Sequence, residues 1–167
     1  MAVSKTIASL DYKELLVLCG VFLKNPLYLL PTYKATNQTV ALSDRLYGKL
    51  HHKDNRTNAF RHALWNYLIC KHCLSVAGSP EKAMNWSKKI TDLHERLSPN
   101  EELAKVMDLH NNRIGRELFF ISRQEDEEET ISTLQQMTRD AVKVESLLEI
   151  DAEKEKLVFI EKLKTPL

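Results

Sequence analysis

Apolar side chains recur every three to four residues along most of this chain, and the alternating pattern typical of strands nowhere persists beyond four residues. This spacing predicts amphipathic helices, each with an apolar face that packs against its neighbours. The predicted helices cover residues 12–24, 26–34, 38–50, 57–77, 80–97, 100–122, a stretch beginning at the acidic run 125–129, and 151–163. We therefore predict an all-α bundle of six to eight helices.

Capping residues mark several of the predicted helix ends. Residues 54–57, Asp-Asn-Arg-Thr, supply N-cap side chains for the helix that Gly78 ends, and Ser79-Pro80 begins the next helix. Residues 98–101, Ser-Pro-Asn-Glu, combine a capping serine, a proline for the first helical position and a glutamate placed for a capping box. The following helix is accordingly predicted to begin at about residue 100. In the acidic run 125–129, carboxylates complement the positive end of a helix dipole.

Length and composition agree with one folded domain over residues 1–167, with a core at about 55–122 and acidic C-terminal helices at about 125–164. Only 4 glycines and 5 prolines are present, which argues against a β architecture with many turns. Residues 1–123 contain 18 Lys and Arg against 11 Asp and Glu, whereas residues 124–167 contain 6 against 12. The basic residues are scattered and not interleaved with aromatic ones, so nucleic-acid binding is disfavoured.

The cysteines and the apolar runs indicate the cellular compartment in which the chain is expected. Cys19, Cys70 and Cys73 are odd in number, and the single Cys70-x-x-Cys73 motif has no second pair to complete a zinc site, so reduced core thiols are expected. The apolar run 15–23 is too short for a membrane span and lacks the flanks of a signal peptide. We expect synthesis in the cytoplasm, no transmembrane segment, and any export to follow a route without a signal peptide.

Two predicted helices carry matching polar stripes. Asn58, Arg61, His62 and Trp65 share one face of the helix 57–77, whose other sides are almost wholly apolar. A helix with that pattern is expected to be buried, so its polar groups must find partners inside the bundle. The second stripe, on the helix 100–122, consists of Asp108, Asn111, Asn112 and Gly115.

Between the two stripes, His94 and Glu95 lie near the end of a third helix, so one cluster could unite all three helices. Gly115 costs about 1 kcal/mol relative to alanine inside a helix, which indicates that another group approaches its backbone closely. The four residues expected to carry chemistry are His62, His94, Glu95 and Asp108. The residues expected to bind substrate or organise the site are Asn58, Arg61, Trp65, Asn111, Asn112 and Arg116.

Two chemistries remain open for this cluster, beside a purely structural role. His62, His94, Glu95 and Asp108 could bind a divalent metal that activates water for hydrolysis. Alternatively, a histidine could act as general base while Arg61 and the asparagine amides hold a substrate oxygen. A zincin site is disfavoured because Ser98 stands where HExxH requires its second histidine.

The other histidines are expected to play smaller parts. His51 and His52 lie in a charged loop and should be solvated. His72 follows Trp65 on the same helix face and should lie at the edge of the cluster, whereas His110 falls on the opposite side of its helix.

Three segments together resemble an uncharacterised helical family found in bacteria. They are residues 58–66 (NAFRHALWN), residues 93–95 (LHE) and residues 107–116 (MDLHNNRIGR), which match the family's NAxRHxxW, HE and MDxxNNxxGR motifs. The resemblance covers about residues 55–120. Members of that family often occur at the C-terminal ends of secreted or polymorphic-toxin-like proteins.

The resemblance implies a bacterial effector or toxin-like hydrolase that acts on a cell-envelope component, either phospholipid or peptidoglycan. A cognate immunity protein or a secretion partner would then be expected. The competing interpretation is a non-catalytic binding or structural module, whose polar network only fixes the packing of the helices. A deep pocket lined by His62, His94 and Asp108 would favour the enzyme, because a catalytic site must admit its substrate.

Overall fold

The computed structural model describes residues 12–52, 55–97 and 100–161. Within these ranges the chain forms seven α-helices and almost no strand, which confirms the predicted all-α fold. The long central helices are α3 (Leu29–Tyr47), α4 (Arg56–Ala77), α5 (Pro80–Leu97) and α6 (Glu102–Ser122). The shorter elements are α2 (Tyr12–Lys24), η1 (Pro26–Tyr28), η2 (Gly48–His52), α7 (Glu127–Arg139), β1 (Val142–Lys143), α8 (Leu147–Ala152) and β2 (Val158–Phe159).

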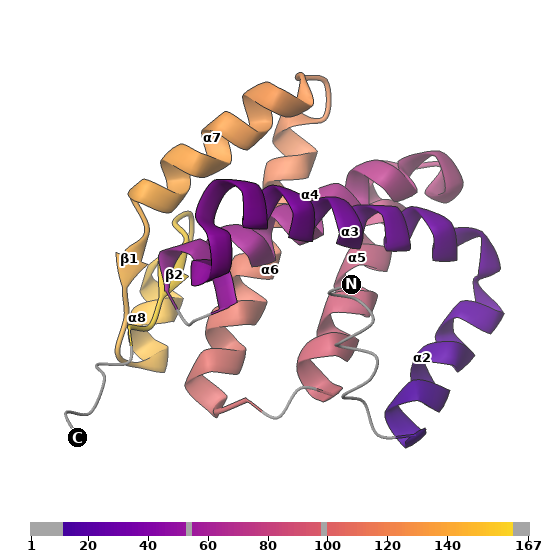
Figure 1. Cartoon of the computed structure of the whole chain (residues 1–167), viewed down its shortest axis with the longest axis horizontal. Helices are drawn as coiled ribbons and strands as arrows, with labels where there is room; N and C mark the ends of the chain where they lie inside the picture. The colour runs from indigo at the N-terminus through magenta and orange to yellow at the C-terminus, as the bar shows by residue number, and fades with distance from the viewer. Residues whose placement is uncertain (1–11, 53–54, 98–99, 162–167) are drawn as a thin grey trace.

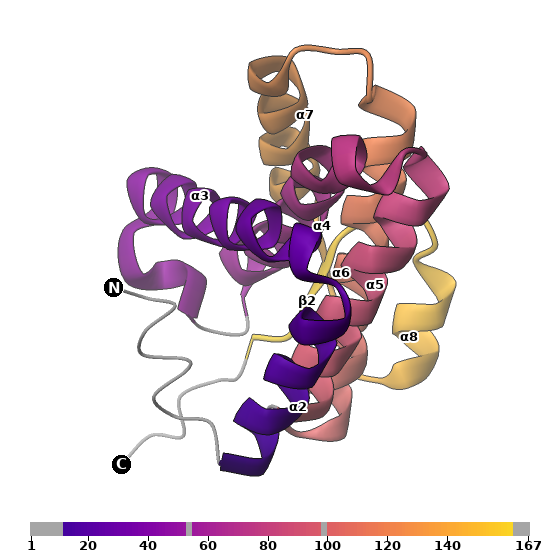
Figure 2. The same cartoon turned by 90° about the vertical axis from the view of Figure 1, so that its right-hand side faces the viewer.

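Helix α4 is the centre of the bundle. It packs against α3, α5, α6 and α7, and Figures 1 and 2 show these helices surrounding it. Its apolar residues Phe60, Leu64, Leu68 and Ile69 are fully buried. The burial predicted from its nearly continuous apolar circumference is therefore confirmed.

Local capping chemistry explains where α4 begins and ends. The Asn55 side chain accepts hydrogen bonds from the backbone N–H groups of Thr57 and Asn58, as expected for an N-cap. At the other end Gly78 adopts a left-handed conformation with φ 74°, which favours glycine. Because α4 is fixed at both ends, its polar stripe keeps a defined orientation toward α5 and α6.

The predicted break between helices 26–34 and 38–50 is wrong, because α3 runs without interruption from Leu29 to Tyr47. Thr32, Thr36 and Thr39 lie in or beside the predicted break, on the inward side of α3. Thr36 Oγ1 donates to the Thr32 carbonyl at 2.8 Å, and Thr39 Oγ1 donates to the Ala35 carbonyl at 2.8 Å. Their hydroxyls are thus satisfied within the helix, so the helix can continue.

The start of α6 also differs from the prediction. The helix begins at Glu102, and its N-cap Glu101 makes no side-chain capping bond. Of the predicted capping residues, 98 and 99 lie outside the described residues. The prediction for α7 is closer: Asp126 caps it by accepting from the Glu128 N–H.

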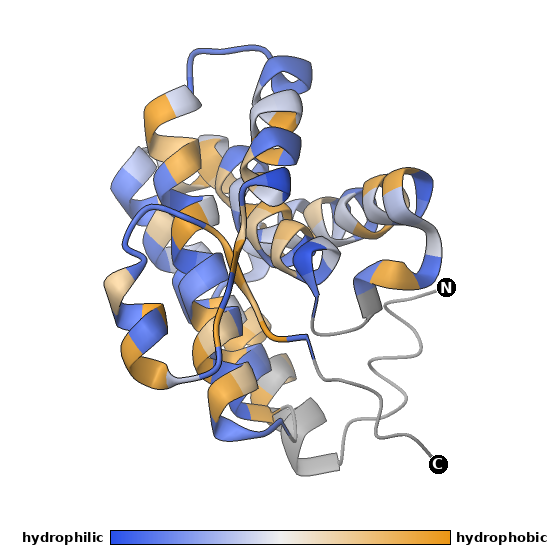
Figure 3. Ribbon diagram, turned by 90° about the vertical axis from the view of Figure 1, so that its left-hand side faces the viewer, coloured by the Kyte–Doolittle hydropathy of each residue, from blue (hydrophilic) through white to orange (hydrophobic). Residues whose placement is uncertain are grey.

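The helix predicted at 151–163 is wrong. The short helix α8 ends at Ala152, and the chain then extends into β2, which pairs in parallel with β1 through Val142 with Val158 and Lys143 with Phe159. Figure 3 shows the two extended segments lying across the helices, with β2 hydrophobic and β1 mixed. The Asn111 amide holds Val158 from α6: its Nδ2 donates to the Val158 carbonyl at 2.9 Å, and its Oδ1 accepts from the Val158 N–H at 3.0 Å.

Two of the other histidines, His51 and His72, depart from their predicted surroundings. His51 is fully buried instead of solvated, and its Nε2 lies 2.9 Å from Asp44 Oδ1. The side chain of His52 lies outside the described residues. His72 bonds to Gln38 on α3, with Nε2 and Oε1 2.7 Å apart, so it lies in the α3–α4 interface and not at the edge of the cluster. His110 donates from Nε2 to the Lys156 carbonyl at 2.8 Å, on the side of α6 that faces β2.

Candidate functional site

Three buried ionisable side chains converge where α4, α5 and α6 meet. His62 on α4 lies between Glu95 on α5 and Asp108 on α6: its Nδ1 is 3.7 Å from Glu95 Oε1, and its Nε2 is 3.2 Å from Asp108 Oδ1. One ligand atom from each residue can be chosen so that all three lie within 4.8 Å of one another. We call these residues the His62–Glu95–Asp108 group.

Hydrogen bonds indicate which nitrogen of His62 carries the proton. Nδ1 lies 3.3 Å from Asn112 Oδ1, an atom that can only accept, whereas Nε2 lies 3.1 Å from Arg61 Nη2, an atom that can only donate. The consistent assignment is a neutral imidazole with its proton on Nδ1. The lone pair of Nε2 then faces the Asp108 carboxylate at 3.2 Å.

The two carboxylates receive side-chain amide donors from both neighbouring helices. Asn58 Nδ2 donates to Asp108 Oδ1 at 3.3 Å, and Asn112 Nδ2 donates to Glu95 Oε1 at 3.4 Å. Within the described part of the chain, two oxygens of the site have no hydrogen-bond partner: Glu95 Oε2 and Asn58 Oδ1. Buried oxygens without donors are costly, and a bound cation would satisfy them.

Burial changes the proton affinities of the site. Desolvation lowers the pKa of His62 well below its ordinary value, and the nearby charges of Arg61 and His94 lower it further. Desolvation raises the pKa of Glu95 to about 7 against the weaker opposing effects of Asn112 and Arg61. The imidazole of His62 is thus neutral at physiological pH, which is the form that binds metals.

Asn66 connects the stripes of α4 and α6 and is fully buried, yet the sequence analysis did not assign it to the site. Its Nδ2 donates to Asn112 Oδ1 at 2.7 Å, and its Oδ1 accepts from Arg116 Nη1 at 2.8 Å and from Ser87 Oγ at 2.8 Å. Thr91 Oγ1 adds a longer bond to the same oxygen. Asn66 lies four residues after His62, so extending the polar stripe by one helical turn would have identified it.

His94, Trp65 and Arg61 form the half-buried edge of the site. The Trp65 ring meets the His94 ring edge-on, with centroids 5.2 Å apart, and Trp65 Nε1 donates to Thr36 Oγ1 on α3. Burial lowers the pKa of His94 to about 4, helped by the Arg61 charge. His94 therefore lies beside the His62–Glu95–Asp108 group and not among its three ligands.

Two further residues expected at the site face elsewhere. The amide of Asn111 points away from the group and holds the backbone of β2, so it joins the C-terminal segment to α6. Arg116 reaches Asn66 rather than a carboxylate of the group. Both belong to the polar stripe of α6, but a stripe about one-third of the circumference wide faces more than one neighbour.

Gly115 makes the close approach that its place in the helix predicted. A Cβ built on Gly115 would lie 2.1 Å from the Ala63 carbonyl oxygen on α4. The backbones of α4 and α6 thus touch at Ala63, the residue after His62, and at Gly115, about one turn after Asn112. This close crossing brings the two polar stripes within hydrogen-bonding distance.

Comparison with known proteins connects the chain to a family. Searches among curated proteins and among solved structures found no match. None of the helices in the described ranges is both long and apolar enough to cross a membrane. A family model covers residues 19–142, which include α3 to α7 and every residue of the site. The chain belongs to the family described as a domain of unknown function, DUF6973.

Proposed function

We propose that this chain is a metal-dependent hydrolase whose divalent cation is held by His62, Glu95 and Asp108. The observation that carries the proposal is the contact between His62 and Asp108. An imidazole lone pair and a carboxylate oxygen 3.2 Å apart repel each other unless a positive charge offsets the repulsion, and a metal ion bound to both atoms would take the place of the Arg61 guanidinium that now donates to Nε2. Two ligand atoms on one metal ion, each at about 2.0–2.2 Å, are about 3.0–3.5 Å apart, which agrees with that separation.

The donor set indicates the class of metal. One imidazole nitrogen and two carboxylates, with the amide oxygen of Asn58 nearby, suit a borderline ion such as Zn²⁺ or Mn²⁺. Asn112 would act on the metal through His62, because its Oδ1 accepts from Nδ1–H and so orients Nε2. Bound there, such a cation supplies Lewis acidity for the activation of water.

The remaining chemistry belongs to the chain itself. Glu95 Oε2 has no hydrogen-bond donor among the described residues, so it can accept a proton from an attacking water and return it to the leaving group. Arg61 lies 3.1 Å from His62 Nε2 at the half-buried edge, where its guanidinium can stabilise an anionic oxygen in the substrate. Trp65 and His94 form the aromatic part of the same edge.

The substrate proposed is the envelope component implied by the sequence resemblance, a phospholipid or peptidoglycan. The biological role proposed with it is that of a bacterial effector or toxin. A cognate immunity protein or secretion partner belongs to the same proposal.

A second candidate, a non-catalytic module with a structural polar network, is favoured by burial. His62, Glu95 and Asp108 are only 3%, 1% and 4% exposed. The pocket found between α5 and α6 is lined by none of His62, His94 and Asp108. A substrate would therefore have to enter past Arg61, Trp65 and His94, whereas a structural network needs no entrance.

Metal binding in solution separates the two candidates. We expect chelator-treated wild-type protein to bind Mn²⁺ or Zn²⁺ with a stoichiometry of about one in isothermal titration calorimetry, since the chain offers one such group. Glu95→Gln should weaken binding at least tenfold, roughly the effect of losing a ligand or its supporting contact. Glu81→Gln, an exposed change on the same helix, should leave it unchanged. Absence of binding to the wild type would support the structural module.

Hydrolysis is then assayed directly with the metal-loaded protein. Release of fatty acid from phospholipid vesicles or of soluble fragments from peptidoglycan should require the metal and disappear in Glu95→Gln. Directing the wild type to the bacterial periplasm should slow growth, and His62→Ala should relieve the effect, whereas His72→Ala on the same helix should not. Metal binding without any hydrolysis or growth effect would support the metal site but contradict the proposed envelope hydrolase.

A further inference from the structure

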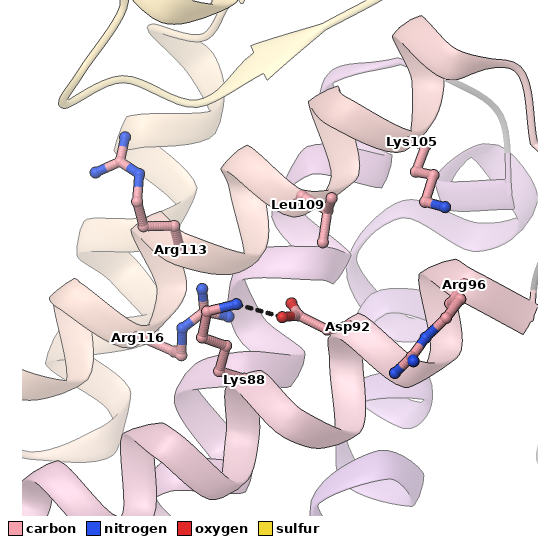
Figure 4. Close-up of a pocket in the computed structure, with 7 residues that line it drawn as sticks. All are labelled: Lys88, Asp92, Arg96, Lys105, Leu109, Arg113 and Arg116. Carbon is pink, nitrogen blue, oxygen red and sulfur yellow. Dashed lines mark hydrogen bonds and ion pairs between the residues drawn. The ribbon is translucent and has the colours of Figure 1, made fainter. Parts of the chain in front are cut away.

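A second, strongly basic pocket lies on the outer side of the α5–α6 pair, away from the His62–Glu95–Asp108 group. Its volume is about 490 Å³, and Figure 4 shows the side chains that line it on both helices, with Arg113 turned away from the others. Leu109 lines its apolar part, and the charged side chains lining it are Lys88, Asp92 and Arg96 from α5 and Lys105, Arg113 and Arg116 from α6. Five cations thus face a single carboxylate.

Part of this positive charge is already neutralised. Asp92 pairs with Lys88, as the dashed line in Figure 4 marks, and Arg113 Nη1 pairs with Glu117 Oε1 at 2.7 Å. Arg96, Lys105 and Arg116 form no ion pair with any residue in the described part of the chain. These three side chains give the pocket its net positive charge.

Arg116 is the most informative of the three because it is buried, only 8% exposed. Its single hydrogen bond within the described chain goes from Nη1 to the neutral amide oxygen of Asn66, at 2.8 Å. That oxygen also accepts from Ser87 and Thr91, so the guanidinium is held in place by a buried hydrogen-bond network on the inner side of the pocket. A guanidinium has five N–H donors, and the carboxylates of Asp92 and Glu117 act on Arg116 through space without a direct ion pair, so an anion in the pocket can take the donors that remain.

We propose that this pocket binds a phosphate-bearing anion, with Arg116 as its buried anchor and Arg96 and Lys105 as flanking cations. A phosphate group offers several acceptor oxygens that match the planar fork of an arginine. The pocket is larger than one phosphate and falls within the range of small-ligand sites, so it can admit the phosphate together with the group that carries it. That phosphate can belong to a free phosphate ester or to a lipid headgroup.

The test uses the full chain after treatment with a chelator, so that binding does not depend on a metal at the first site. One arm titrates inorganic phosphate by calorimetry. The other measures co-sedimentation with phosphatidylcholine vesicles that contain phosphatidylglycerol, relative to phosphatidylcholine alone. Binding in the first arm identifies the free anion, and binding in the second arm alone identifies the lipid headgroup. Both arms are repeated with added NaCl, which should weaken binding.

Two variants and a matched control make the outcome specific. The double variant Arg96→Gln/Lys105→Gln should weaken binding of the active probe about tenfold or more, because two charge-assisted contacts are lost. The control Lys82→Gln/Lys89→Gln removes the same charge from exposed positions on α5 that do not line the pocket, and should change binding less than about twofold. Arg116→Gln should abolish binding if thermal melting shows that it folds.

Failure of both probes to bind the wild type would overturn the proposal. So would equal weakening by the pocket variant and the control, because binding would then follow net charge and not this pocket. Metal binding at the His62–Glu95–Asp108 group is measured separately, so the two sites succeed or fail independently.

Discussion

Gly115 of α6 packs directly against the backbone of Ala63 of α4: a Cβ added to Gly115 would lie 2.1 Å from the Ala63 carbonyl oxygen and 2.7 Å from its Cα. Because the opposing atoms belong to the backbone, no side-chain rotation can make room. The helices would have to separate, and the hydrogen bonds of His62 with Asn112 and of Asn66 with Asn112 would lengthen.

We therefore predict that Gly115→Ala destabilises the protein by about 3 kcal/mol or more, above the usual range for an overpacked core. At this chain length that corresponds to a fall in Tm of about 10 °C, measured by circular dichroism. Gly20→Ala is the matched control: Gly20 is also helical, but nothing lies within 4 Å of an added Cβ. The control should be neutral or stabilising by up to about 1 kcal/mol. Equal effects of the two changes would contradict the close crossing.

Asp108→Asn tests whether the Asp108 charge serves chemistry or stability. Its Oδ1 contacts His62 Nε2 and accepts from Asn58, and an asparagine oxygen can keep the latter bond. If the carboxylate is kept for a cation, its removal should change Tm by less than about 5 °C, an effect of 1–2 kcal/mol, while Mn²⁺ binding is lost. Asp151→Asn, an exposed change on α8, should affect neither. A fall of more than about 10 °C would favour the structural module, in which removing one buried charge costs about 3–5 kcal/mol.

Helical periodicity in the sequence predicts part of this site, but it does not predict which of two adjacent residues points into the site. The helical stripes placed His62, Asn58, Asp108 and Asn112 together because side-chain direction follows directly from helical periodicity. His94 and Glu95 were both expected in the cluster, but adjacent residues on a helix point about 100° apart. Glu95 accordingly enters the group, and His94 lies against Trp65.

The remaining departures arise from tertiary contacts that a local pattern does not contain. The segment 158–159 is extended because the Asn111 amide replaces a strand partner for Val158, a contact across 47 residues. His51 lies in η2, which begins at Gly48 with a φ of 58°, and it is buried with its ring against Asp44 of α3. The threonine hydroxyls of α3 donate to carbonyls of the same helix, so they need no partner outside it and do not mark a break. None of these contacts follows from hydrophobic spacing.

The raised pKa of Glu95 predicts a pH dependence of stability, in the presence of a chelator, that the wild type has and Glu95→Gln lacks. The pKa of the folded state, about 7, is above the ordinary value of 4.5, so the folded protein binds more protons between these values. The free energy of unfolding contributed by Glu95 therefore falls as the pH rises from about 4.5 to 7. Relative to the wild type, Glu95→Gln should gain at most about 3 kcal/mol between pH 5 and pH 8.

Thermal melting of both proteins across this range checks the prediction. The histidines of the site are present in both proteins, so their own pH dependence cancels in the difference. Parallel curves for the two proteins would contradict a Glu95 carboxyl that is held protonated by burial.

The three thiols should differ in reactivity. Cys19 is exposed, whereas burial raises the pKa of Cys70 to about 12 and that of Cys73 to about 11. Because the thiolate is the reactive form, one thiol per native chain should react rapidly with a disulfide reagent at pH 8, and all three after denaturation. Cys19→Ser should remove the rapid phase. Rapid reaction of more than one thiol in the native protein would show that the α4 thiols are accessible.

The claim on which the functional account depends is that a cation belongs between His62, Glu95 and Asp108. Anomalous scattering from a crystal soaked in Mn²⁺, recorded at the manganese edge, tests it most directly. We expect a peak about 2.0–2.3 Å from His62 Nε2 and from one oxygen of each carboxylate. No peak at this position under saturating Mn²⁺ or Zn²⁺, with His62 still in direct contact with Asp108, would contradict the metal site and leave the polar network as structural.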